Sequence, residues 1–219
     1  MTGRHYLVGG QRYPSVTTIL GILAKDGLVQ WRGHVGNLAA DRTSREAAAY
    51  GTMLHGLVET ANRGHRDHLD PSERQLVAPY VAWFDEHVSH VIAAERFVVS
   101  RRHKFAGTAD VVVVMRGDHD ATVVDLKSSK SDLEQREWQL QLAAYALALE
   151  EEGIDVRRRI VVRMPRNAPD TLHVLEMPEN DLVVDQKCFL SVLRIFRWYA
   201  AQGPVVKPLG PRIRFGEVR

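Results

Sequence analysis

Two apolar runs joined by a short polar turn constrain the fold of this chain more than any other feature. The first run, residues 105–115, contains four consecutive valines, and the second covers residues 121–124. Such runs are typical of strands covered on both faces, and the turn formers between them favour a hairpin. Each run carries a carboxylate that needs a partner once it is buried, Asp110 in the first and Asp125 directly after the second. The sequence therefore predicts two aspartates on neighbouring strands.

A lysine stands two positions after Asp125. Positions i and i+2 of a strand face the same side, so Asp125 and Lys127 are expected to emerge together. Two carboxylates and an ammonium on adjacent strands suit a hard divalent cation and phosphate chemistry. The tripeptide Asp-x-Lys is common, and Lys127 serves equally well as a surface partner of Asp125. The predicted pairing of Asp125 with Asp110 across the hairpin is what favours a metal site over a surface ion pair.

The bulk composition is that of an ordinary globular chain, long enough for one well-buried domain. It has 219 residues, of which 45% are hydrophobic and 26% charged, with a net charge of +2. We expect one domain over residues 1–219, mainly helical at 1–90, with a sheet core and a C-terminal helix at 91–219.

Several classes of protein are disfavoured by the same sequence. The longest apolar stretches are far short of the roughly 20 residues that span a bilayer, and the first residues lack the apolar core of a signal peptide. The single cysteine, Cys188, excludes an intramolecular disulfide and any four-cysteine zinc or iron–sulfur site within one chain. We therefore expect a cytoplasmic location and no membrane partner.

Turn and capping signals divide the chain into elements. At the N-terminal side they predict a hairpin at 6–13, helices at 16–24 and 28–41, a helix opened by the capping-box pattern Thr43–Glu46 and reaching 62, and a helix from Asp70 to 90. Beyond it they predict strands at 91–100, 104–115, 121–127, 156–164 and 171–177, and helices at 133–152 and 180–201. This order predicts an α/β fold, with a mixed central sheet flanked by helices and a helical N-terminal portion.

Basic residues gather in blocks although the net charge is small. Residues 157–166 carry five arginines and no acid, and a second block lies at 101–104. Such blocks suit a polyanionic partner, with a solvated face as the alternative. Aromatic side chains that could stack on unpaired bases are Trp31, Trp138 and Tyr145.

Two helical patterns carry further candidates. Gln141 and Tyr145 share one helix face. This face either is the ordinary polar side of the helix, with the tyrosine half-buried, or points back at the aspartates. The opposite face is the expected core stripe: Leu140, Ala144, Leu147 and Ala148. His55 and Glu59 are one turn apart, so both can reach a site from one helix, although a lone helical histidine is more often structural.

Four motifs, taken in order, resemble the PD-(D/E)XK nuclease superfamily. They are Gly51–His55, Gly107–Asp110, Asp125–Lys127 and Gln141–Tyr145. The resemblance is strongest to the RecB-type exonuclease branch, which includes CRISPR-adaptation nucleases and phage recombination nucleases. The opening Ser15–Leu20 is similar to phage-type members. The resemblance implies the restriction-endonuclease-like core and metal-dependent hydrolysis of phosphodiester bonds.

The resemblance also implies a role for each matching residue. One or two Mg2+ or Mn2+ ions would be bound by His55, Asp110, Asp125 and the backbone carbonyl of Leu126. Lys127 would orient or activate water, Asp110 and Asp125 would be catalytic, and Gln141 and Tyr145 would contact DNA near the scissile phosphate. Glu95 is a candidate counterpart of a family acid. The DNA-binding residues would be Gln141, Tyr145, Lys130, Arg101, Arg102, Lys104 and Trp31.

Some relatives carry a four-cysteine iron–sulfur cluster, which the lone Cys188 excludes here. The chain has no Walker motif, so unwinding would need a separate helicase or single-strand-binding partner. We therefore expect a DNA exonuclease acting on single strands or ends, in phage-type recombination, repair or DNA processing. The alternatives are an endonuclease of the same superfamily and a DNA-binding module without catalysis.

Overall fold

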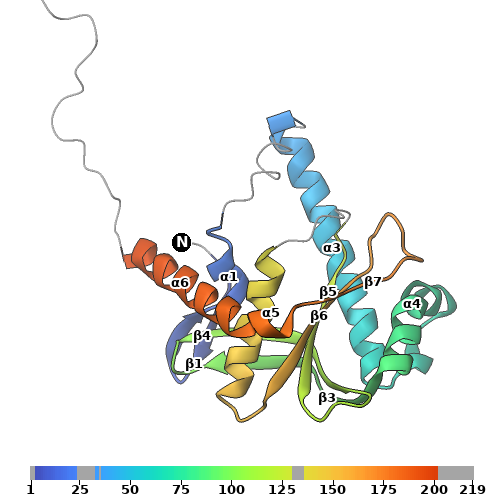
Figure 1. Ribbon diagram of the computed structural model, residues 1–219. Helices are drawn as coiled ribbons and strands as arrows, with labels where there is room; N and C mark the ends of the chain where they lie inside the picture. The colour runs from blue at the N-terminus through green and yellow to red at the C-terminus, as the bar shows by residue number, and fades with distance from the viewer. Residues whose placement is uncertain (1–2, 24–32, 35, 130–135, 202–219) are drawn as a thin grey trace, which may run out of the picture.

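The centre of the fold is a five-stranded sheet in the order β3-β4-β5-β6-β7 (Figure 1). The computed structural model describes residues 3–23, 33–34, 36–129 and 136–201. β5 and β6 are parallel, and all other neighbours are antiparallel. The strands are β3 (Val88–Ser100), β4 (Phe105–Met115), β5 (Ala121–Lys127), β6 (Val156–Arg163) and β7 (His173–Glu176). The predicted α/β class with a mixed central sheet is confirmed, and so is the predicted β4–β5 hairpin.

Helices cover both faces of the sheet (Figure 1). One face carries α1 (Val16–Leu20), α5 (Arg136–Glu150) and α6 (Leu182–Ala201), and the other carries α3 (Asn37–Asn62) and α4 (Pro71–His87). Short 3-10 turns are η1 (Arg66–His68) and η2 (Glu179–Asp181). Neighbouring residues of β5 show the two-residue period, since Val123 packs in the α5 layer and Val124 in the α3–α4 layer.

β4 and β5 separate just where the two aspartates stand. Their ladder ends at the pair Val111–Val124, beyond which β5 continues beside β6, while β4 continues beside β3. An unpaired strand edge needs cover. A hairpin of β1 (His5–Val8) and β2 (Gln11–Pro14) supplies it, and Ser15 forms a bridge to Ala106 on the edge that β5 has left. We call this divergence of β4 and β5 the fork.

Two predicted helix starts have different outcomes. The start at Asp70 is confirmed, because its carboxylate accepts hydrogen bonds from the amides of Ser72 and Glu73, and the Glu73 carboxylate accepts one from the amide of Asp70. The start at Thr43 is wrong, because α3 runs unbroken from Asn37. The residues before Thr43 favour helix strongly enough to extend it. Of the helix predicted at 28–41, residues 28–32 and 35 lie outside the described residues, and residues 37–41 form the start of α3.

Three of the five arginines in the block at 157–166 are held within the fold by burial or by ion pairs. Arg159 is buried and donates to Asp185 of α6 at 2.6 Å. Arg158 pairs with Asp118 and Glu176, and Arg163 is buried. The sequence did not reveal these contacts, because the acids come from other elements, which the local sequence around β6 does not contain.

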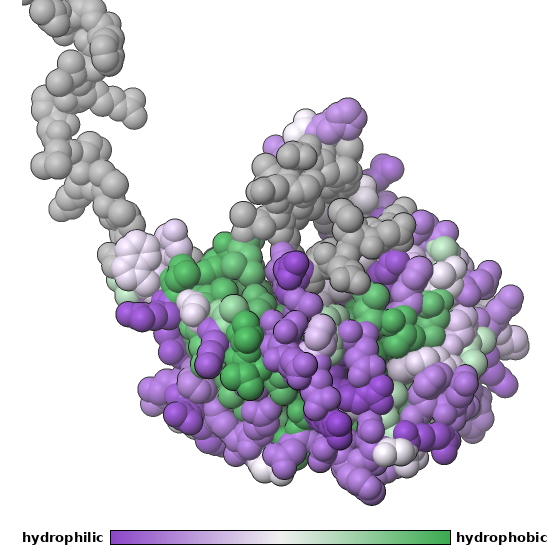
Figure 2. Space-filling view, in the orientation of Figure 1, coloured by the Kyte–Doolittle hydropathy of each residue, from purple (hydrophilic) through white to green (hydrophobic). Residues whose placement is uncertain are grey.

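The outer side of α6 leaves apolar surface exposed, visible as the hydrophobic area over this helix in Figure 2. Its exposed members are Val183, Val184, Ile195, Trp198 and Tyr199. This surface belongs to the helix layer that carries α5. Among the described residues, none of the helices is both long enough and apolar enough to cross a membrane.

Candidate metal and catalytic site

Three potential metal ligands converge beside the fork. His55 comes from α3, Glu95 from β3 and Asp110 from β4, and one ligand atom of each lies within 4.8 Å of the others. The Nδ1 atom of His55 is 3.3 Å from Oδ1 of Asp110, and all three side chains are half-buried. Carboxylates suit hard cations such as Mg2+ or Mn2+, and imidazole is a common metal ligand. This donor set fits a divalent cation, and we call it the metal group.

Glu95 reaches this group from a strained backbone. Its φ of 49° is in the left-handed region, which costs a residue with a side chain about 1–2 kcal/mol. The residues on either side of Glu95 pair with the neighbours of Asp110, so Glu95 stands opposite Asp110 in the β3–β4 ladder. The irregularity therefore lies where β3 presents a carboxylate to Asp110. The resemblance had offered Glu95 only as a candidate family acid, and local sequence gives no sign of its backbone conformation.

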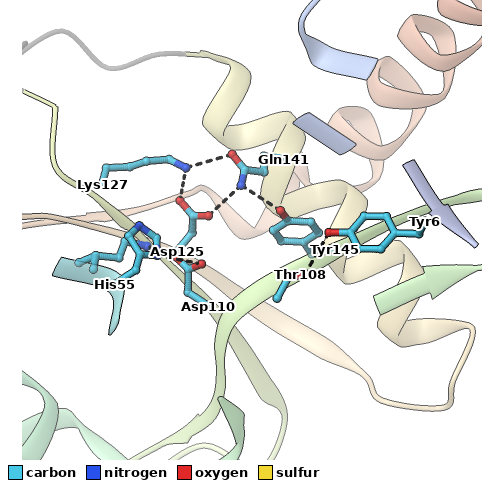
Figure 3. Close-up of polar contacts among 9 residues, drawn as sticks. Tyr6, His55, Thr108, Asp110, Asp125, Lys127, Gln141 and Tyr145 are labelled. Atoms are coloured by element: carbon cyan, nitrogen blue, oxygen red, sulfur yellow. Dashed lines mark hydrogen bonds and ion pairs between the residues drawn. The ribbon is translucent and has the colours of Figure 1, made fainter. Parts of the chain in front are cut away.

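A second cluster joins β5 to α5. The ammonium of Lys127 lies 2.6 Å from Oδ2 of Asp125 and donates to Oε1 of Gln141 at 3.1 Å. The amide nitrogen of Gln141 donates to Oδ1 of Asp125 at 2.8 Å and to the hydroxyl of Tyr145 at 3.0 Å. Figure 3 shows these side chains in a row that starts at Lys127. The predicted side-by-side placement of Asp125 and Lys127 is confirmed.

Asp110 connects the two clusters across the fork. Its Oδ2 accepts a hydrogen bond from the backbone amide of Leu126 at 2.7 Å, where β4 no longer provides a ladder partner. The N–H and C=O of one strand residue point to the same side. The carbonyl of Leu126 therefore points toward the Asp110 side, as its predicted ligand role requires. Asp125 itself is buried and is not part of the metal group.

Two motif glycines make room for these contacts. A Cβ on Gly107 would lie 2.6 Å from Cε1 of Tyr145, so the tyrosine ring lies directly on the β4 backbone. A Cβ on Gly51 of α3 would lie 3.3 Å from Oγ of Ser128, just after Lys127. The sequence predicted a close approach at Gly107 but did not identify the ring of Tyr145 as the group that approaches.

The prediction for α5 is confirmed in part. Gln141 and Tyr145 are buried and point back at the aspartates, which was one of the two alternatives. In the expected core stripe Ala144 and Ala148 are buried, whereas Leu140 and Leu147 are only partly buried. The cause is that α1 and α6 cover α5 from outside, so that almost every side of the helix is enclosed. Gln141 and Tyr145 were predicted to contact DNA, but their partners in this structure are Asp125, Lys127 and each other.

Burial and charge shift the acid–base behaviour of the site. Burial raises the pKa of the Asp125 carboxyl to about 6 against the opposing charge of Lys127. Burial lowers the pKa of His55, but the hydrogen bond and charge of Asp110 outweigh it, so that pKa is raised overall. Burial and the charge of Asp110 raise the pKa of Glu95. Because these acids are buried and close together, their protonated forms are favoured. A divalent cation would compete with the protons for the same oxygen atoms.

Other predicted DNA-binding residues are not gathered at the site. Arg101, Arg102 and Lys104 are exposed on the β3–β4 turn; six residues of strand, about 20 Å, separate Lys104 from Asp110. Trp138 is buried in the core and is unavailable for base stacking. Trp31 and Lys130 lie outside the described residues.

Comparison with known proteins gives one family match. A model of the PD-(D/E)XK nuclease superfamily matches residues 39–186, a range that includes both clusters. No curated protein matches the chain. The structure of SSO0001 is similar at 17% identity and a TM-score of 0.38, over 81% of this chain and 82% of that chain. A candidate exonuclease from Eubacterium rectale is similar at 9% identity and a TM-score of 0.41, over 67% of each chain.

Proposed function

The chain belongs to the PD-(D/E)XK nuclease superfamily, and we propose that it is a Mg2+- or Mn2+-dependent exonuclease acting on single-stranded DNA or free DNA ends. One observation carries the proposal: the ligand atoms of His55, Glu95 and Asp110 lie within 4.8 Å of one another. The Asp125–Lys127 pair is linked to this group through the Asp110–Leu126 hydrogen bond. An ordinary surface cluster of acids would have no reason to adjoin a buried carboxylate–ammonium pair.

Each residue receives a role from its contacts. His55, Glu95 and Asp110 would hold the cation, with Asp125 and the Leu126 carbonyl beside them. Lys127 is partly exposed and has three N–H donors, of which Asp125 and Gln141 engage two. The remaining donor would orient water or a phosphate oxygen. Gln141 and Tyr145 are positioning residues, because they hold Asp125 and Lys127 in place.

The cation would stabilise negative charge on the phosphate oxygens and on the leaving group during hydrolysis. EDTA is therefore expected to stop cleavage, and added Mg2+ or Mn2+ to restore it. Binding of a cation to the folded state should also raise the melting temperature, and His55→Ala should reduce that increase. Cleavage that persists fully in EDTA would contradict the proposal.

The exonuclease reaction is tested by comparing linear and circular single strands of the same sequence. We expect end-labelled linear oligonucleotides to be shortened from one end while circles stay intact. Equal cleavage of both would assign an endonuclease instead. DNA bound without any cleavage, under all metal conditions, would assign the non-catalytic binding module.

The biological setting follows from the resemblance. We place the protein with the RecB-type branch, in phage-type recombination, repair or DNA processing in the cytoplasm. A helicase or single-strand-binding protein would supply unpaired DNA. Adding such a partner to a blunt duplex should accelerate digestion, whereas it should not accelerate digestion of a strand that is already single.

A further inference from the structure

The hydrogen-bonded row at the site continues onto the N-terminal hairpin. The hydroxyl of Tyr6 on β1 lies 3.2 Å from Oγ1 of Thr108 on β4. Figure 3 shows Tyr6 and Thr108 next to Tyr145, at the end of the row opposite Lys127. Thr108 lies two residues from Asp110 along β4, a distance of about 6.6 Å. Two nucleotides of a stacked nucleic-acid strand, at about 3.4 Å each, cover about the same distance. The hairpin is therefore within reach of nucleotides next to the metal group.

Tyr6 belongs to an aromatic shelf, which consists of Arg4, Tyr6 and Phe97. The rings of Tyr6 and Phe97 are 5.2 Å apart, and the guanidinium of Arg4 lies 4.8 Å from the centre of the Tyr6 ring. Phe97 is 44% exposed although it lies within β3. Single exposed apolar side chains are common on protein surfaces. Phe97 differs from them because its exposed ring lies beside the ring of Tyr6, which in turn contacts the guanidinium of Arg4.

Charge on the hairpin complements a nucleic-acid backbone. Residues 3–23 contain Arg4 and Arg12 and no aspartate or glutamate, and both arginines are exposed. Neither forms an ion pair with any residue that the structure describes. Exposed aromatics combined with unpaired cations are the usual means of binding single strands.

From these contacts we propose that the aromatic shelf binds an unpaired nucleotide about two positions from the scissile phosphate, with its base stacked on Phe97 and a phosphate at Arg4. Tyr6 holds the shelf against Thr108. Bases within a duplex are covered by their own neighbours, so the shelf selects a single-stranded end. This inference rests on the proposed nuclease function, because it takes DNA as the substrate.

The test measures DNA binding separately from cleavage. A fluorescent single-stranded oligonucleotide is titrated with the full chain in EDTA, and its dissociation constant is compared among variants. Phe97→Ala removes one stacking ring and is expected to weaken binding about five-fold or more. Phe97→Trp should restore binding. Ile92→Ala is the matched control, because Ile92 lies on the same strand with a similar exposed fraction of 42%.

Two further measurements separate stacking from a general effect on the fold. Phe97→Leu keeps apolar volume but removes the ring, so it should weaken single-strand binding and leave duplex binding unchanged. Arg4→Gln should lower the slope of log affinity against log salt by about 0.7, the contribution of one phosphate contact on a single strand.

The shelf is overturned if Phe97→Ala and Phe97→Leu bind the single strand as tightly as the wild type does, or if the wild type does not bind it. Equal losses for single strand and duplex would also overturn it. None of these outcomes would affect the nuclease proposal, which is judged by metal-dependent cleavage. Conversely, a chain that binds single strands through Phe97 but never cleaves them would support the shelf and contradict the nuclease proposal.

Discussion

The Asp125–Lys127 pair on β5 and the Arg159–Asp185 pair between β6 and α6 each join a buried carboxylate to a cation at 2.6 Å. They differ in whether the cation is enclosed as well. The side chain of Arg159 is 1% exposed, whereas that of Lys127 is 21% exposed. The carbonyl of Pro178 accepts a further hydrogen bond from Arg159 at 3.0 Å. The Arg159–Asp185 pair is thus enclosed, and the Asp125–Lys127 pair points its ammonium outward.

This difference separates a stabilising contact from a reactive one. A guanidinium that is only 1% exposed cannot be reached by a ligand, so its role is confined to the fold. An ammonium at the edge of a buried carboxylate can exchange one protein contact for a phosphate or water. The two pairs should therefore respond in opposite ways to mutation.

Breaking the closed pair should give the largest change in stability. Asp185→Ala leaves Arg159 buried without its carboxylate, and we expect the free energy of unfolding to fall by about 3–5 kcal/mol. Urea denaturation measures this loss. Cleavage per folded molecule should be unchanged. The double replacement of Arg159 by Met and Asp185 by Leu should recover most of the stability, because no charge is left buried alone. Failure of that recovery would show that the pair has another role.

Breaking the open pair should instead affect cleavage. Asp125→Asn and Lys127→Met keep the side-chain size, and each should lower kcat at least about 100-fold, as the loss of one well-placed electrostatic group does. We expect a smaller loss of stability than in Asp185→Ala, because Lys127 reaches the surface. Cleavage rates and urea curves from the same preparations provide the comparison. Near-normal cleavage in both variants would contradict the site assignment.

The packing of α5 against the fork can be tested at Gly107. An added methyl group would collide with the ring of Tyr145, so Gly107→Ala should cost about 1–3 kcal/mol of stability and should also slow cleavage by displacing Gln141. Gly56→Ala is the control with the opposite sign. No atom lies within 4 Å of a Cβ at Gly56 of α3, so this change should stabilise the helix by up to about 1 kcal/mol. Equal effects at the two glycines would refute the Tyr145 contact.

The smallest effect is expected at Glu95, where stability and metal binding should change in opposite directions. Glu95→Gly relieves the left-handed backbone and should raise the free energy of unfolding in EDTA by up to about 1 kcal/mol. The same variant should lose much of the added stability that Mn2+ gives the wild type. Glu95→Gln removes the charge that Asp110 repels but keeps the strain, so it should lose the metal effect and gain less stability in EDTA than Glu95→Gly does. A full metal effect in Glu95→Gly would remove Glu95 from the metal group.

The sequence determined the features that depend on neighbours in the chain. The two-residue period of a strand placed Asp125 beside Lys127, and the turn formers between the valine run and Ala121 joined β4 to β5. The start of α4 at Asp70 followed from a capping pattern that lies within four residues. Each of these is a local preference that no distant contact opposed.

Only the tertiary structure decided which faces became interior. α5 turned Gln141 toward the fork because α1 and α6 cover its other sides, Arg159 became a core residue because Asp185 came from a distant helix, and Tyr6 reached Thr108 from 102 residues away. Such contacts depend on the order of the strands and on the point where β4 and β5 part. Side-chain periodicity does not contain that information, since it fixes which residues share a face but not what will cover it.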